Sequence, residues 1–220
     1  MSRRLATVAA ALAVLALAAT DAAGQAAVRF AAGATATQYR VRSTTGDDTE
    51  TLGAPGFGAE GVIAVWRIAL EGRYVQAGLE PGATATATLA RDAVEGHLLL
   101  AVRATPWLSV STGPLARSYE TTLGSQRWLL WTVRARGTPV LVPDAVRGYA
   151  ELWGALPVDI DVPESWNSGW GGDVGLVLAV PRLPLWLRLG YRFEQYRLGD
   201  GTRRETIDGA TLSIGAGRLQ

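Results

Sequence analysis

Apolar and polar residues alternate along most of this chain, and the alternation is clearest over residues 95–119. In the first half of that stretch one parity is apolar, with Leu98 and Leu100, while the other carries polar residues such as His97 and Arg103. Successive side chains of a strand point to opposite faces of a sheet, so a period of two requires one apolar and one polar environment. The pattern therefore predicts antiparallel strands joined in hairpins.

The same alternation, interrupted by turn-forming residues, predicts an all-β, up-and-down antiparallel barrel of about ten strands, with eight as the alternative count. The predicted strands span residues 27–42, 58–66, 68–79, 94–104, 108–119, 126–136, 146–153, 172–180, 185–198 and 205–217. Tight joins are expected at 67, 105–107 and 182–184, a longer one at 137–145, and polar joins at 43–57, 80–93, 121–125, 154–171 and 200–204. Short turns at one end and longer loops at the other are typical of transmembrane barrels.

The first residues predict a secretory signal peptide over 1–23, followed by a single barrel domain over 24–220. Arg3 and Arg4 precede an apolar run over 5–19, which is shorter than the roughly 20 residues that a membrane-spanning helix needs. No later apolar run approaches that length. A mature chain in a membrane would therefore have to be a closed barrel, because unpaired backbone groups are not tolerated in hydrocarbon.

Charge and cysteine content narrow the function classes. Removing Arg3 and Arg4 from the 21 basic residues, and Asp21 from the 20 acidic ones, leaves 19 of each in the predicted mature chain. This balance gives no basic footprint for nucleic acid, which we do not expect as a partner. The chain has no cysteine, so disulfides and a lipid-anchored cysteine are excluded.

The polar parity of the predicted strands carries charges of both signs, with arginine as the only basic residue. In a membrane barrel these residues would line the lumen as a network of ion pairs, a role that suits the planar, permanently charged guanidinium of arginine. In the alternative, a soluble periplasmic or secreted lipocalin-like barrel holding an apolar ligand, they would form a solvated surface. The residues of this expected lumen network are Glu71, Arg73, Glu95, His97, Arg103, Arg134, Arg147, Glu151, Asp173, Arg188, Arg192 and Glu194.

Aromatic residues sort by the ends of the predicted strands. Three tryptophans lie at or beside tight turns, and three tyrosines lie near the opposite strand ends. Amphipathic Trp and Tyr rings prefer the two levels at which headgroups meet hydrocarbon, so the spacing predicts two aromatic girdles. The girdle residues are Trp66, Trp107, Trp186, Tyr39, Tyr119 and Tyr196.

This arrangement resembles the small integral outer-membrane β-barrels of Gram-negative bacteria, over nearly the whole mature chain, through hairpins such as 174–189 and the placement of Trp and Tyr. The resemblance implies location in the outer membrane, contact with its lipid, insertion by the barrel-assembly machinery and a monomeric state. The chain departs from the family at its end, because many members finish the last strand with Phe or Trp, whereas this chain ends Arg218-Leu219-Gln220.

Histidine-dependent catalysis would have to use His97, the only histidine. A serine nucleophile, His97 as base and Glu95 as orienting acid would make a triad. Hairpin pairing, however, places Ser109 opposite Arg103 and His97 opposite Leu115, out of reach of each other. We therefore expect no catalytic residue and no enzymatic activity; the enzymatic alternative is an outer-membrane lipid-modifying or proteolytic barrel that depends on His97.

Two predicted loops carry acidic residues. Asp47 and Asp48 in the first long loop, and Asp159 and Asp161 in the fourth, resemble the acidic pairs of outer-membrane proteases, but these loops have no histidine to complete such a site. Asp159, Asp161 and Glu164 could bind calcium, because hard cations prefer several carboxylate oxygens. They lack a ligand-loop pattern, so solvated acids are expected, with no metal and no cofactor.

Trp166 and Trp170 lie in a glycine-rich stretch that is predicted to be a loop. Exposed there, they would form a sugar-stacking or adhesive surface, or fold over the barrel opening. Small barrels of about eight strands are filled by side chains, and open channels need about sixteen. The expected function is therefore structural, surface-interacting or narrowly solute-binding, rather than that of a general porin.

Overall fold

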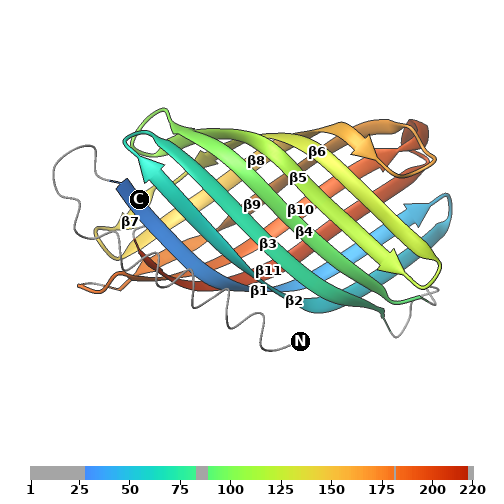
Figure 1. Ribbon diagram of the computed structural model, residues 1–220, viewed down its shortest axis with the longest axis horizontal. Coiled ribbons are helices and arrows are strands. Elements are labelled where there is room, and N and C mark those ends of the chain that lie inside the picture. Colours follow the sequence, from blue (N-terminus) through green and yellow to red (C-terminus); the bar gives the residue numbers. More distant parts are fainter. Residues whose placement is uncertain (1–27, 83–88, 181, 218–220) are drawn as a thin grey trace.

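In the computed structural model the chain is a single antiparallel sheet closed into a barrel (Figure 1). The structure describes residues 28–82, 89–180 and 182–217, so the predicted signal peptide at 1–23 lies outside the described residues. The long strands are β1 (Val28–Thr45), β2 (Asp48–Val65), β3 (Ile68–Pro81), β4 (Arg91–Arg103), β5 (Leu108–Thr121), β6 (Gly124–Gly137), β8 (Val146–Ile160), β9 (Trp166–Ala179), β10 (Leu185–Leu198) and β11 (Arg203–Gly217). The three-residue strand β7 (Val140–Val142) lies in the β6–β8 connection, and the single turn of 3-10 helix η1 (Gly199–Gly201) lies between β10 and β11.

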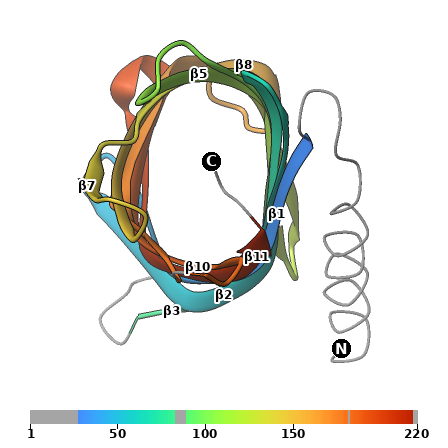
Figure 2. The same cartoon turned by 90° about the vertical axis from the view of Figure 1, so that its left-hand side faces the viewer.

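Neighbouring strands pair in chain order, and two further pairings close the ring. β1 pairs with β11 from Ala31↔Gly217 to Thr45↔Arg203, and β6 pairs with β8 around the short β7. Figure 2 looks along the barrel at the end where β1 begins and β11 finishes, which we call the near end; the opposite end is the far end. The predicted all-β barrel of ten strands is confirmed. Among the described residues, no helix is long and apolar enough to cross a membrane.

The strands are longer at the far end than the sequence predicted. Residues 43–57 were expected to form a long join, but β1 and β2 pair up to Thr45↔Asp48, and only Gly46 and Asp47 form the turn. Residues 154–171 were likewise expected to be a loop, yet they contain the ends of β8 and β9. The expected difference in length between near-end and far-end joins is therefore wrong. Residues 43–57 are mostly small or polar, so hydrophobic alternation is weak there although backbone pairing continues.

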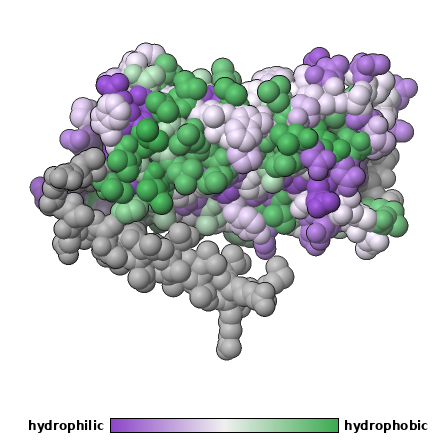
Figure 3. All heavy atoms as spheres, turned by 45° about the horizontal axis from the view of Figure 1, so that its top comes forward, coloured by the Kyte–Doolittle hydropathy of each residue, from purple (hydrophilic) through white to green (hydrophobic). Residues whose placement is uncertain are grey.

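The outer wall of the barrel carries an apolar belt. Large apolar side chains point outward and are exposed on all ten long strands. They include Val28, Ile63, Ile68, Leu70, Leu98, Leu100, Val110, Val133, Leu152, Val174, Leu176, Leu189, Leu212 and Ile214. In Figure 3, green side chains gather over the middle of the visible face and purple ones at its right-hand end. An apolar surface of this extent needs a covering of similar character, because soluble monomers rarely expose more than a few hundred Å² of continuous apolar patch.

The interior is layered. Toward the far end, apolar and aromatic side chains fill the barrel and form its hydrophobic core, which we call the apolar layer. Its largest fully buried members are Leu52, Leu79, Leu115, Trp128, Leu130, Tyr196 and Leu198. Most of the buried charged side chains occupy the middle and the near half; one further carboxylate, Glu205, is buried in the far part, where it accepts from the Tyr119 hydroxyl at 2.8 Å. The charged part of the interior is thus separated from the far opening by packed apolar groups.

Two glycines make room for a ring inside the near half. A Cβ at Gly33 or at Gly215 would come closer to the Trp186 ring than van der Waals contact allows. We expect Gly215→Ala to lower the free energy of unfolding by about 1–3 kcal/mol, because overpacking forces side chains and backbone to shift. Urea titration of the refolded barrel in detergent measures this. Gly154→Ala is the control, since a Cβ there meets nothing within 4 Å; equal losses at both positions would contradict the explanation.

Candidate functional site

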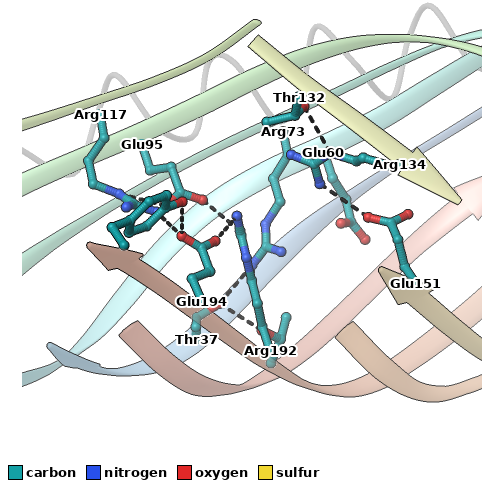
Figure 4. A network of polar contacts seen from close by, with 12 residues as sticks. Thr37, Glu60, Arg73, Glu95, Arg117, Thr132, Arg134, Glu151, Arg192 and Glu194 are labelled. Carbon is teal, nitrogen blue, oxygen red and sulfur yellow. Dashed lines mark hydrogen bonds and ion pairs between the residues drawn. The ribbon is translucent and has the colours of Figure 1, made fainter. Parts of the chain in front are cut away.

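Four charged side chains form a ring across the middle of the barrel (Figure 4). The Arg117 guanidinium donates to Glu95 Oε2, at 2.5 Å from NH2, and to Glu194 Oε2 at 2.6 Å. Arg192 donates to Glu95 Oε1 at 2.6 Å and also forms an ion pair with Glu194. Tyr196 donates its hydroxyl to Glu194 at 2.6 Å. We call Glu95, Arg117, Arg192 and Glu194 the ion ring.

Strand pairing explains why the ring forms. Glu95 on β4 lies directly opposite Arg117 on β5, so they share one position on the inner wall. Arg192 and Glu194 are two residues apart on β10 and therefore face the same side. All four are almost completely buried. A buried ion pair is expensive to form, but each member becomes necessary once its partner is inside. The ring therefore ties opposite walls of the barrel together.

A second group of ion pairs lies on β6, β8 and β3. Glu151 accepts from Arg134 at 3.1 Å and from Arg136 at 2.5 Å, and Arg136 also donates to Glu71 at 3.0 Å. Separately, Arg188 on β10 pairs with Glu60 on β2. Guanidinium groups also stack on aromatic rings, with Arg134 4.9 Å from the Trp153 ring centroid. Each of these carboxylates thus has an arginine partner.

Three interior polar groups have other surroundings. Arg73 donates to the Thr37 hydroxyl at 3.0 Å and forms no ion pair with a described residue. Asp173 accepts from the Tyr149 hydroxyl at 2.9 Å. Nδ1 of His97 is buried without a hydrogen-bond partner among the described groups. His97 lies opposite Leu115, and Arg103 lies opposite Ser109, as the hairpin pairing predicted.

Two spaces flank the packed interior. A cavity of about 90 Å³ in the near half is lined by charged and aromatic side chains, including Arg73, His97, Arg134, Glu151, Trp186 and Arg188. Arg103 lies closer to the near opening, in a smaller pocket that it shares with Arg29. At the far end an open vestibule of about 720 Å³ is lined mainly by polar groups, among them Ser43, Asp48, Glu50, Arg91, Ser125 and Arg203.

The remaining member of the expected lumen network, Arg147 on β8, lies on the inward parity of Tyr149 and Glu151 and is exposed at the near end. The structure therefore brings Glu71, Arg134 and Glu151 together with Arg136 in one group of ion pairs. The predicted residues Glu95, Arg192 and Glu194 meet in a separate group, the ion ring. The structure does not bring His97 to a serine.

The expected aromatic girdles need correction. Trp66 and Trp107 are exposed at near-end turns, but Trp186, Tyr119 and Tyr196 are buried and Tyr39 packs against the apolar layer. Inward residues of β10 are even-numbered, so Tyr196 shares the face of Glu194 and Arg192; the parity rule could have placed it. The exposed aromatic side chains on the outer wall of the middle and far parts are instead Phe57, Tyr74, Trp131, Trp170 and Tyr191.

The expected loop tryptophans both lie in strand β9. Trp166 packs inward, with its ring centroid 6.4 Å from that of Trp128 and 5.8 Å from that of Tyr196. Trp170 points outward, is 46% exposed and lies 5.4 Å from the Phe193 ring. The expected shared surface of the two rings is therefore wrong. The pairing of β9 with β10 shifts register between Trp166 and Ser168, so Trp166 faces inward although Trp170, four residues later, faces outward.

Of the acidic loop residues, the calcium-ligand candidate Glu164 forms an ion pair with Arg203 at 3.2 Å, and Asp47 lies in the β1–β2 turn. Four charged interior residues were not predicted: Glu60, Arg117, Arg136 and Glu205. Arg117 and Arg136 share the inward parity of Leu115 and Arg134, so that signal was available. Glu60 lies two residues from the start of the predicted strand 58–66, where too few neighbouring residues alternate to show which side it faces.

No protein-family model matches the sequence, and no curated protein matches it. Among solved structures, the translocator domain of the autotransporter NalP from Neisseria meningitidis matches over 97% of both chains, with a TM-score of 0.43 and 12% identity. Neisserial surface protein A matches over 84% of this chain and 96% of its own, with a TM-score of 0.35 and 10% identity. A FadL homologue from Pseudomonas aeruginosa matches over 86% of this chain and 64% of its own, with a TM-score of 0.32 and 13% identity.

All three TM-scores are below 0.5, so the fold assignment rests on the strand pairing and on the distribution of side chains. The strands form a closed ring, charged residues face inward, and an apolar belt faces outward. In this the chain has the architecture of the bacterial outer-membrane β-barrels.

Proposed function

We propose that the protein is an integral outer-membrane barrel without catalytic activity, sealed against solutes, which presents its far end for surface interaction. The observation that carries the sealed state is the filling of the interior by the ion ring and by the apolar layer above it. The alternative, a soluble barrel around an apolar ligand, is disfavoured because the interior groups of the near half are charged while the outer wall is apolar.

Membrane insertion is tested by cell fractionation and gel mobility of the detergent-extracted protein. We expect a membrane-fraction band that migrates faster before boiling than after it, because a closed barrel resists detergent until it is heated. A protein that stays in the soluble fraction, with unchanged mobility, would contradict the membrane assignment.

Sealing is tested by conductance in planar bilayers. The refolded wild-type chain is expected to give no stable channel steps, since the packed side chains of the ion ring and the apolar layer lie between the near-half cavity and the vestibule, which share no lining residue. Reproducible open steps at low voltage would refute the sealed state. A second measurement, uptake of small sugars into liposomes that contain the barrel, checks solutes that carry no current.

A further inference from the structure

Three arginines lie together on the outer wall at the far end. Arg42 on β1, Arg204 on β11 and Arg197 on β10 are all exposed and occupy the outward parity of three adjacent strands. Arg197 lies directly opposite Arg204, and Arg204 is paired with Thr44, two residues from Arg42. Strands are about 4.8 Å apart, so the cluster is about 10 Å wide. We call these three residues the basic patch.

The basic patch lacks the carboxylate partners that most buried arginines of the barrel interior have. None of its members forms an ion pair with another described residue, whereas Arg117, Arg134, Arg136, Arg188 and Arg192 in the interior all do. Like charges directly opposite each other on neighbouring strands are unfavourable. The repulsion between Arg197 and Arg204 therefore costs free energy, which an anion bound to both side chains on the outer wall would offset.

The patch lies just beyond the apolar belt. On β11 the outward side chains run from Ile214 and Leu212 to Asp208, and then to Arg204. Asp208 is already occupied, because it accepts from Arg40 Nε at 3.0 Å and from the Tyr191 hydroxyl at 3.1 Å. The basic patch thus lies on the far-end side of this ion pair, beyond the apolar belt. In a membrane barrel, that is the height at which lipid headgroups meet the barrel wall.

The wall across the barrel has the opposite sign. Glu80 on β3, Asp92 on β4 and Glu120 on β5 are exposed on the outward parity, and Asp92 lies opposite Glu120. An anionic headgroup would be repelled there and attracted at the basic patch. The charge pattern therefore selects one side of the barrel.

We propose that Arg42, Arg197 and Arg204 bind the phosphate of a lipid headgroup in the membrane leaflet at the far end. The inference rests on the proposed membrane location. Planar guanidinium groups match phosphate oxygens in charge and in hydrogen-bond geometry. The ligand class is a phosphorylated lipid whose acyl chains lie along the apolar side chains of β10 and β11, below the patch.

A second copy of the chain is the competing occupant, with its acidic wall against this basic patch. That contact would be head-to-tail and would not close, so it would produce open chains of barrels rather than a defined oligomer. A stable protein interface also needs about 1,000 Å² or more, which is wider than a patch of three side chains. The size of the patch favours one headgroup.

Native mass spectrometry of the refolded full chain in zwitterionic detergent tests the site, with lipid A carrying two phosphates as the probe. R197Q/R204Q is expected to bind it about 25-fold more weakly than wild type, from about five-fold per arginine near an anionic lipid surface. The matched control is R127Q/R182Q, which removes two exposed arginines on β6 and at a near-end turn and should bind like wild type. Dephosphorylated lipid A should bind wild type and R197Q/R204Q equally.

Unchanged lipid A binding by R197Q/R204Q, or an equally large loss of binding by R127Q/R182Q, would overturn the site. So would millimolar inorganic phosphate that competes with lipid A as well as the intact lipid does. Salt-sensitive chains of wild-type barrels formed without lipid would point instead to a second copy of the chain. Gel mobility before and after boiling is measured on the same samples. A variant that remains a heat-modifiable membrane barrel but shows no phosphate dependence refutes the site alone, whereas loss of heat-modifiability in wild type refutes the membrane location.

Discussion

Replacing Glu194 with glutamine (E194Q) is expected to lower the free energy of unfolding by about 3–5 kcal/mol, the usual cost of removing one partner from a buried ion pair. Glu194 is 0% exposed and forms ion pairs with both Arg117 and Arg192. Glutamine keeps the size of the side chain but removes its charge, so two buried guanidinium groups are left with Glu95 as their shared carboxylate. Urea titration of the refolded barrel, followed by tryptophan fluorescence, measures the change.

Glu80→Gln is the matched control, because Glu80 is exposed on the outer wall of β3 and its substitution should cost little. Adding Arg117→Gln to E194Q restores the charge balance of the ring, so the double variant should regain part of the lost stability. A loss for E194Q no larger than that for the control would show that the ion ring does not hold the walls together.

Replacing Trp128 with alanine is expected to have a comparable effect on stability and a second effect on sealing. Trp128 is 1% exposed and packs edge-on against Tyr196, with ring centroids 5.4 Å apart. Large aromatic side chains in cores cost about 3–5 kcal/mol when truncated to alanine. Because Trp128 belongs to the apolar layer, the variant should also let small solutes through that the wild-type barrel excludes.

Unfolding by urea and liposome uptake of small sugars measure the two effects of this substitution. Trp107→Ala is the control, since Trp107 is 58% exposed at a near-end turn and contributes nothing to the interior. If Trp128→Ala lowers stability but leaves the barrel impermeable, the ion ring alone is sufficient to seal it. If neither property changes, the apolar layer is not part of the core.

The sequence predicted the barrel because its middle section separates two environments. Between Glu95 and Arg103 the even-numbered residues face outward and the odd-numbered residues face the interior. Hydrophobicity therefore alternates, and the alternation predicts both that the segment is a strand and which side chains point inward. The same rule does not reveal partners across the barrel. Arg192 and Glu95 are far apart in sequence and meet only through closure of the ring, which no local pattern records.

The errors arise where the side chains are too small or too polar for the alternation to show. Over residues 43–57 the far-end hairpin has polar groups on its outer face beside apolar Leu52 inside, in a short stretch rich in glycine and threonine. Composition therefore indicated a loop, while backbone pairing continued. Distance from the strand ends predicted girdle positions for the tyrosines, but alternation decides the face. Tyr196 lies two residues from the inward-facing Glu194 and Leu198, so it faces inward as well.

The ion ring has a consequence for how the protein is built. Its carboxylates and guanidinium groups come from β4 and β5 in the first half of the chain and from β10 near its end. A partly assembled sheet would expose half of these charges to hydrocarbon without their counterparts, which is costly in a membrane. Insertion is therefore expected to be all-or-none, with the last hairpins in place before the first ones enter lipid. Truncated chains that lack β10 should then fail to insert, rather than accumulate as half-barrels.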